Sequence, residues 1–169
     1  YLLTLWTEVK ISRRPIQALA QRSNHYSIGV NNLQKADVYK YLDGKASMLN
    51  DISDKIWEYA ETAFEEYKSV ELLQEVLREH GFTLESGLAG IETAFCASYG
   101  SGSPVIGILA EYDALSGMSQ KAFGPQREER EKGGNGHGCG HNMFAAGSVG
   151  TALAVKEYLV NSGTKGTIN

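Results

Sequence analysis

A glycine-rich block at residues 136–142 places two imidazoles and a thiol at alternate positions. His137, Cys139 and His141 are separated by single glycines. Glycine permits a tight turn that would bring side chains two residues apart to one point. Thiolate and imidazole form a borderline-soft donor set that suits zinc or a similar divalent ion. Spacing alone leaves three interpretations open: a metal site, a reactive thiol on Cys139, or a glycine-rich turn without chemistry.

Two carboxylates form a second candidate site. Glu111 and Asp113 directly follow the apolar run 105–110. Because they are two residues apart, their side chains would point the same way on an extended chain. In open α/β sheets, sites form outside the carboxyl ends of such strands. The alternatives are a solvated pair at the end of a strand and an ordinary turn aspartate.

The surrounding sequence predicts elements that would position these groups. Apolar periodicity predicts a helix from about residue 37 to 59, with Gly44 as its weak point. Thr62 and Glu65 match a capping box, which predicts a second helix from 62 to Gly81 with Glu66 on its solvated face. Strands are predicted at 82–85, 93–99 and 105–110, then a polar loop over 116–135 and a helix over 142–159. The last strand lacks alternation, so we expect it to be buried on both faces of a mainly parallel sheet.

Composition excludes several classes of protein. Hydrophobic residues make up 42% and charged residues 21% of the 169 residues. No apolar run approaches the roughly 20 residues of a membrane-spanning helix, so no membrane partner is expected. Lys and Arg number 16 against 20 Asp and Glu, so the chain lacks the positive charge that nucleic-acid binding requires. Two cysteines favour a reducing compartment and a cytoplasmic protein, with Cys96 as a core residue.

Residues 1–35 differ in composition from the rest. The first 30 residues hold four basic side chains and a single acidic one. We therefore treat 1–35 as an unassigned basic N-terminal extension, with an organelle-targeting leader as the alternative.

Three ordered blocks, at residues 56–66, 110–117 and 134–142, resemble the zinc amidohydrolases of the aminoacylase and carboxypeptidase group. Within this group, the chain is similar to amidohydrolases of the p-aminobenzoyl-glutamate hydrolase type. The resemblance runs from about residue 52 to the C-terminus and does not cover residues 1–35. It implies a catalytic domain with a two-metal site that binds zinc, or alternatively manganese.

The resemblance also implies roles for individual residues. Cys139 and His141 correspond to metal ligands, and Asp113 corresponds to an aspartate that orients a metal ligand. Glu111, His137 and Asn142 are candidates for supporting positions around the metal. Related members often carry aspartate where this chain has Glu111 and Asn142.

The fold that the resemblance implies is a three-layer αβα arrangement around a mainly parallel mixed sheet, incomplete at its C-terminal end. Residues 36–169 would form the N-terminal part of this catalytic domain. In the family, a Glu-Glu pair follows the next strand and provides the general base, so this base is expected to be absent from the chain. We therefore expect residues 1–169 alone to be inactive and, because a sheet edge would be uncovered, poorly soluble.

The function implied is metal-dependent hydrolysis of the amide bond of an N-acyl amino acid or a dipeptide-like compound, such as a p-aminobenzoyl-glutamate-like substrate. The expected partners are this small-molecule amide and, in the intact protein, a second copy or a homologous subunit. Two alternatives are a non-catalytic subunit or binding module derived from the same family, and a thiol-based redox protein built on Cys139.

Overall fold

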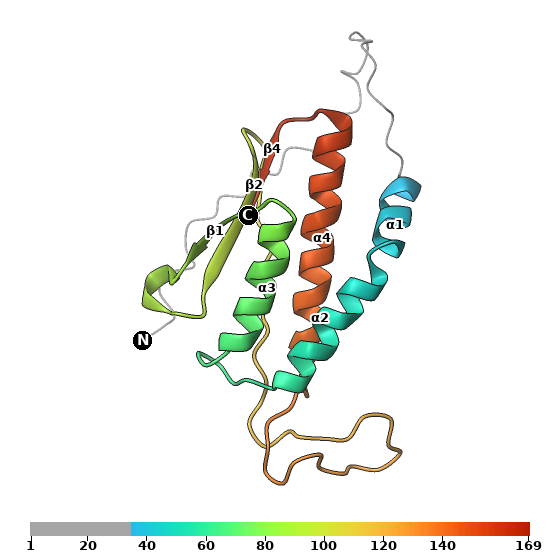
Figure 1. Cartoon of the computed structure of the whole chain (residues 1–169), viewed down its shortest axis with the longest axis vertical. Coiled ribbons are helices and arrows are strands. Elements are labelled where there is room, and N and C mark those ends of the chain that lie inside the picture. The colour runs from blue at the N-terminus through green and yellow to red at the C-terminus, as the bar shows by residue number, and fades with distance from the viewer. Residues whose placement is uncertain (1–34) are drawn as a thin grey trace, which may run out of the picture. The chain divides into compact units, whose positions relative to one another are not determined.

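The computed structural model describes residues 35–169 and begins with two helices in place of the single one predicted (Figure 1). Helix α1 spans Lys35–Asp43 and α2 spans Ala46–Tyr59. They are separated at Gly44, the predicted weak point, where the Gly44 N–H still donates to the Lys40 carbonyl. Predictions for the basic extension at residues 1–34 lie outside the described residues.

Helix α3 spans Tyr67–Glu79 and starts five residues later than the capping box predicts. Thr62 instead forms an isolated bridge with Ala114, and no side-chain cap is made by Glu66. The Glu61 carboxylate accepts the backbone N–H groups of Lys68 and Ser69, both at 2.9 Å. The predicted capping box is therefore wrong, because a carboxylate from before the turn satisfies the first turn of the helix.

Four strands form an open mixed sheet in the order β1-β2-β4-β3. Their bounds are Thr83–Ser86 for β1, Phe95–Ser101 for β2, Val105–Ile106 for β3 and Gly166–Ile168 for β4. β2 pairs antiparallel with β1 and β4, whereas β3 pairs parallel with β4. A short 3-10 turn, Leu88–Gly90, lies in the connection between β1 and β2. The α/β class and the mixed sheet are confirmed, although parallel pairing is the minority among the described strands.

The strand predicted to be buried on both faces is short and exposed. Val105 is 62% exposed and Leu109 is 84% exposed. β3 has a partner only at β4, so its other edge is uncovered in the described part of the sheet. The apolar run therefore lies at a sheet edge, and the prediction of burial on both faces is wrong for these residues.

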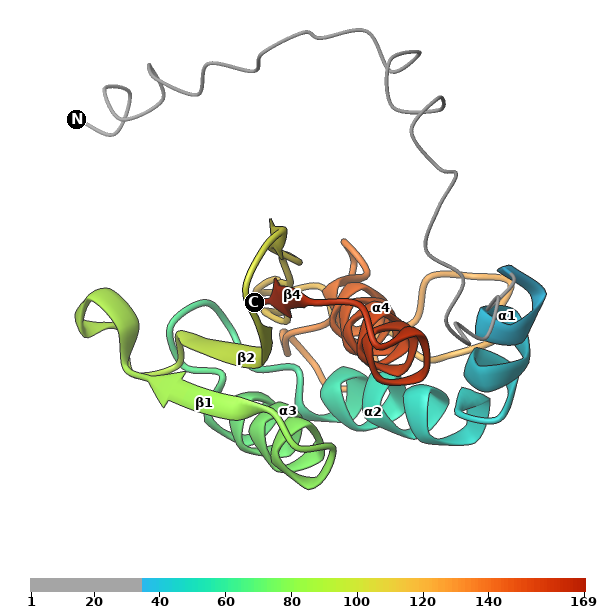
Figure 2. The same ribbon diagram turned by 90° about the horizontal axis from the view of Figure 1, so that it is seen from above.

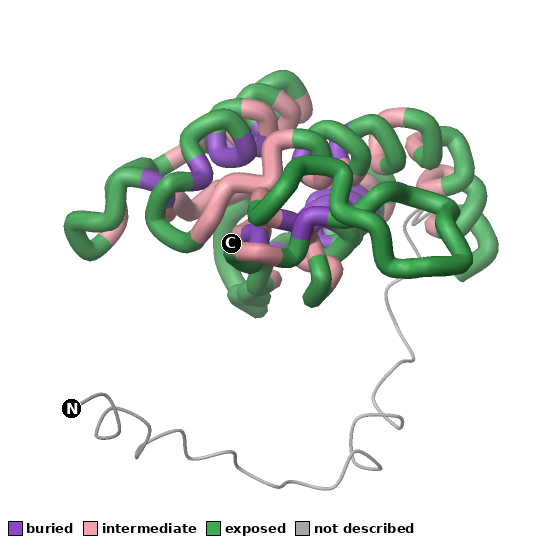
Figure 3. Tube along the Cα trace, turned by 90° about the horizontal axis from the view of Figure 1, so that it is seen from below, coloured by how far each residue is buried: buried purple, intermediate pink, exposed green. Residues whose placement is uncertain are grey.

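Helix α4, His141–Ser162, organises the core. In Figure 2, α3 and α4 lie along the same side of the sheet, with α2 packed beside α4. The fully buried side chains of Leu153, Ile52 and Ile56 lie in one cluster that joins these layers. Figure 3 shows the buried positions grouped inside this assembly. Each such side chain contributes about 1.5–3 kcal/mol through its burial.

Gly150 explains the close approach of α4 to α2. A Cβ at this position would lie 3.0 Å from Leu49 Cδ1. No helix within residues 35–169 is long and apolar enough to cross a membrane.

Candidate metal centre

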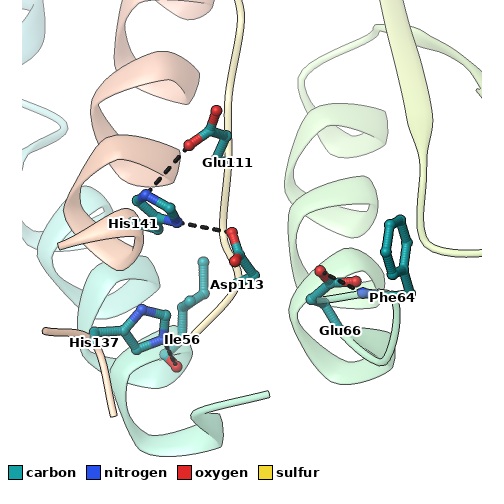
Figure 4. A network of polar contacts seen from close by, with 7 residues as sticks. All are labelled: Ile56, Phe64, Glu66, Glu111, Asp113, His137 and His141. Carbon is teal, nitrogen blue, oxygen red and sulfur yellow. Dashed lines mark hydrogen bonds and ion pairs between the residues drawn. The ribbon is translucent and has the colours of Figure 1, made fainter. Parts of the chain in front are cut away.

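Three side chains from two segments meet at one point. Glu111 and Asp113 lie in the extended segment that follows β3, and His141 is the first residue of α4. Their ligand atoms all lie within 4.8 Å of one another. Figure 4 shows the His141 ring between the two carboxylates. We call these three residues the carboxylate–histidine cluster.

The His141 ring contacts each carboxylate through a different nitrogen. Nδ1 lies 2.7 Å from Asp113 Oδ1, and Nε2 lies 3.2 Å from Glu111 Oε2. A carboxylate on one imidazole nitrogen fixes the tautomer and leaves the other nitrogen as the ligand. Asp113 therefore orients His141 so that Nε2 faces Glu111, as the sequence predicts for an orienting aspartate.

The donor set of the cluster fits a divalent ion. It combines one imidazole with two carboxylates, the ligand types that Zn²⁺ and Mn²⁺ accept. Glu111 has a 61% exposed side chain, whereas those of Asp113 and His141 are 26% and 18% exposed. One side of the cluster is thus open for ligand entry, as a catalytic metal site requires.

Helix α4 holds both halves of the cluster together. Ser148, two turns after His141, donates from Oγ to the Leu109 carbonyl at 2.8 Å. On the other side, the Ala114 N–H donates to the Glu61 carbonyl at 2.7 Å. The segment that carries Glu111 and Asp113 is therefore fixed at both ends before any ligand binds.

The turn before α4 needs its glycines. The backbone of Gly136 pairs with Leu115 in both directions at 3.0 Å. A Cβ on Gly136 would lie 2.2 Å from the Met118 carbonyl oxygen, which real Cβ atoms do not approach so closely. Gly140 has a φ of 82° and leads directly into His141. The long loop 116–135 departs from this end of the fold, where α4 begins (Figure 1).

The structure separates the other predicted residues from the cluster. Cys139 lies in the turn and is exposed, and its thiol is not one of the three clustered groups. Asn142 is buried and donates from Nδ2 to Ser53 Oγ at 3.0 Å, which joins the start of α4 to α2. The role of Cys139 as a ligand therefore remains a prediction.

His137 anchors the turn to α2. Its Nε2 donates to the Ile56 carbonyl at 3.0 Å, as Figure 4 shows. Burial lowers the pKa of His137 below its usual 6.5, and the nearby His141 acts in the same direction. The ring is thus neutral near pH 7, with its proton on Nε2. Its buried Nδ1 has no hydrogen-bond partner among the described residues.

Two residues beside the cluster were not predicted from the sequence. Glu66 was expected on a solvated helix face, but it is only 8% exposed, and its Oε2 has no partner among the residues described. Phe64, two residues earlier, is 67% exposed and has a φ of 69°. Neither carries a sequence signal, because both fall within a pattern that also fits an amphipathic helix.

Tyr112 lies between the two carboxylates in sequence but turns away from them. Its hydroxyl donates to the Thr93 carbonyl, and its ring lies 6.3 Å from that of Phe95. Burial, together with the negative charge of Glu66, raises the pKa of Tyr112 to about 12. The side chain therefore fixes the alternation that directs Glu111 and Asp113 to the other face of the segment.

A pH titration can test this burial. We expect one tyrosine to ionise near pH 12 rather than at its ordinary value of 10, followed by the ultraviolet absorbance of tyrosinate. The folded state favours the neutral phenol, so its contribution to stability is complete below pH 10 and is lost as the pH rises towards 12. Tyr112→Phe should remove this late transition. Loss of a transition near pH 10 instead would contradict the assignment.

Comparison with known proteins supports the site. No family model matches the chain. A search of curated proteins finds a subunit of p-aminobenzoyl-glutamate hydrolase from Escherichia coli K12, 42% identical over 136 residues and matched by 78% of the chain. The chain belongs to the amidohydrolase family of this hydrolase. The predicted resemblance to these amidohydrolases is thereby confirmed.

Two solved structures share the fold. One is the YXEP protein of Bacillus subtilis, a dinuclear metal-binding peptidase of the M20 family, with a TM-score of 0.61 and 23% identity over 75% of the chain. The other is described as an aminohydrolase from methicillin-resistant Staphylococcus aureus, with a TM-score of 0.64 and 20% identity over 80% of the chain. The chain spans 28% of the length of the E. coli relative and 34% and 33% of these two structures.

Proposed function

We propose that the chain forms part of a metal-dependent hydrolase that cleaves the amide bond of an N-acyl amino acid or a dipeptide-like substrate. The carboxylate–histidine cluster is the observation that carries this proposal. The substrate class is supported by the 42% identity to a protein whose name specifies p-aminobenzoyl-glutamate. A hydrolase of this kind acts on a neutral amide, which polar groups beside an open metal site can bind and orient.

The residues of the cluster have distinct roles in this proposal. His141 Nε2 and a Glu111 carboxylate oxygen would hold a divalent ion, and Asp113 keeps the His141 ring in place from Nδ1. Cys139, in the turn before α4, is the further ligand that the family resemblance implies. When bound, the ion supplies a Lewis acid that polarises an amide carbonyl and lowers the pKa of water. We propose zinc, with manganese as the alternative, and a second metal in the intact protein.

The remaining parts of the proposal concern the intact protein. The family resemblance places the proton acceptor, a glutamate, outside these 169 residues. Because the E. coli relative is named as one subunit of its enzyme, we propose that the intact protein pairs with a homologous subunit or with a second copy. The cytoplasm is the proposed location.

The proposal can be tested by hydrolysis assays with the natural protein. After removal of metal by a chelator, activity on p-aminobenzoyl-glutamate and on N-acyl amino acids should vanish and return with Zn²⁺ or Mn²⁺. Residues 1–169 alone should bind metal more weakly and should not turn over substrate. If the natural protein binds metal but hydrolyses none of these amides, the alternative of a non-catalytic subunit is correct.

A further inference from the structure

A second pocket adjoins the carboxylate–histidine cluster. It has a volume of about 280 Å³ and shares Glu111 and Asp113 with the cluster. Its remaining lining comes from the turn before α3 and from the connection between β1 and β2, which contribute Phe64, Glu66, Ile91 and Phe95. A pocket of this size suits a single ring or a short side chain rather than a drug-sized ligand. Whatever occupies it lies directly beside the proposed metal site.

Glu66 brings an unsatisfied acceptor to this pocket. The residue is 8% exposed, and its Oε1 accepts the backbone N–H of Phe64 at 3.0 Å. Oε2 is buried and has no hydrogen-bond partner among the described residues. A buried carboxylate oxygen without a donor is unfavourable, and native proteins rarely leave one unpaired. The oxygen is therefore available to a donor that the pocket receives.

The local structure keeps Glu66 Oε2 free. Glu66 precedes α3, where the backbone N–H groups of the first turn would normally attract its carboxylate. Glu61 already accepts the N–H groups of Lys68 and Ser69, and it also accepts the Ser69 hydroxyl at 2.8 Å. The helix thus has a different carboxylate as its cap, and Glu66 is not consumed by that role.

Phe64 provides an apolar wall at the cost of backbone strain. Its φ of 69° is in the left-handed region, which a bulky residue rarely adopts. Its ring is nevertheless 67% exposed, so burial of the ring does not compensate the strain. Figure 4 shows the ring standing next to the Glu66 carboxylate, to which the Phe64 N–H donates. Strain of this kind gathers at sites that bind ligands.

We propose that this pocket selects an acyl group that is flat and apolar and that carries an amine, whose N–H is accepted by Glu66 Oε2. The inference rests on the proposed function, because the pocket is defined as a substrate site by its contact with the cluster. Phe64, Ile91 and Phe95 contact the apolar body of the group. Glu66 then discriminates between donors and acceptors at its far end, as a buried polar group does when one partner lacks the matching atom.

The substitution Glu66→Gln gives a directional test. The Phe64 N–H requires an acceptor, so it fixes the amide oxygen of glutamine where Oε1 now lies. The amide NH₂ then occupies the position of Oε2 and presents a donor to the pocket. An amine on the substrate would meet a donor instead of an acceptor. The preference for an amine should therefore be lost, and the effect should exceed that of simply removing a charge.

Two measurements follow with the metal-loaded natural protein. The ratio of kcat/KM for p-aminobenzoyl-glutamate over benzoyl-glutamate should fall about tenfold or more in Glu66→Gln, as expected for a lost charge-assisted hydrogen bond. Damage to folding would affect both substrates alike and leave the ratio unchanged. The neighbouring Glu65→Gln, an exposed position, is the matched control and should keep the wild-type ratio.

Binding provides a readout independent of turnover. Ligand-observed NMR should show that 4-aminobenzamide binds the wild-type protein several-fold more tightly than benzamide, and that Glu66→Gln abolishes the difference. If wild type hydrolyses neither glutamate conjugate but retains this binding preference, the proposed function fails and the role of Glu66 stands. Equal affinities of wild type for the two benzamides, or an unchanged kcat/KM ratio in Glu66→Gln, would overturn the inference. The wild-type comparison decides the matter even if the variant does not fold.

Discussion

Replacing His141 by alanine should lower the affinity for Zn²⁺ or Mn²⁺ by more than about 100-fold. Loss of a group that only supports a ligand already costs about 10- to 100-fold in metal affinity, and His141 is itself the central side chain of the cluster. Both of its ring nitrogens face carboxylates, at 2.7 and 3.2 Å. Isothermal titration calorimetry with the natural protein would measure the change.

Asp113→Asn and His80→Ala bracket the expected result. Asparagine keeps the size of Asp113 but removes the charge that holds His141 Nδ1, so a loss of about 10- to 100-fold is expected. His80 lies at the end of α3, where its Nδ1 contacts the Val76 carbonyl, and its replacement should leave the affinity unchanged. If His141→Ala bound metal as wild type does, the site would have to be rebuilt around Cys139, which Cys139→Ser would reveal.

Gly136→Ala should destabilise the protein by about 2–4 kcal/mol, because it overpacks the site and endangers a pair of backbone hydrogen bonds. The added Cβ would lie 2.2 Å from the Met118 carbonyl oxygen and 2.7 Å from its carbon. Neither backbone can withdraw freely, since Gly136 is paired with Leu115 in both directions. Thermal or chemical unfolding, followed by circular dichroism, would measure the loss.

Gly147→Ala is the matched control for this change. Gly147 lies inside α4, and a Cβ there would meet nothing within 4 Å. The same substitution should therefore stabilise the protein by about 0.5–1 kcal/mol through helix propensity. Opposite signs for the two glycines would locate the effect in the turn. An unchanged stability in Gly136→Ala would mean that the turn is looser than its contacts indicate.

The sequence predicts the ends of elements best where a single residue type decides the backbone. Gly44 marks the break between α1 and α2, although the periodicity on both sides favoured one continuous helix. The start of α4 is predicted within one residue, because the glycines before His141 cannot continue a helix. These features are local, so composition alone carries them.

Features that depend on distant partners were not predictable. The capping box at Thr62 is chemically sound, but Thr62 pairs with Ala114, more than 50 residues away, and Glu61 caps the helix instead. The run at 105–110 has the composition of a buried strand, yet burial depends on which neighbours cover it. Both errors come from reading local pattern as tertiary contact.

The candidate site divides in the same way. Asp113 and His141 were predicted from their positions in the motifs, and they lie 2.7 Å apart. Glu111 was expected in a supporting position, whereas the structure places it within the cluster itself. Glu66 had no signal at all, since its burial results from the turn at Phe64 and not from its own neighbours in sequence.

The pocket and the cluster draw on different parts of the chain. The cluster comes from residues 111–113 and the first residue of α4, whereas the Ile91 and Phe95 walls come from the connection between β1 and β2. Substitutions in that connection alter which acyl groups fit and leave the cluster intact. Selection can therefore diversify the substrates of such proteins through residues 88–95, while purifying selection preserves Asp113 and His141. Among relatives, substrate preference should diverge faster than the chemistry of cleavage.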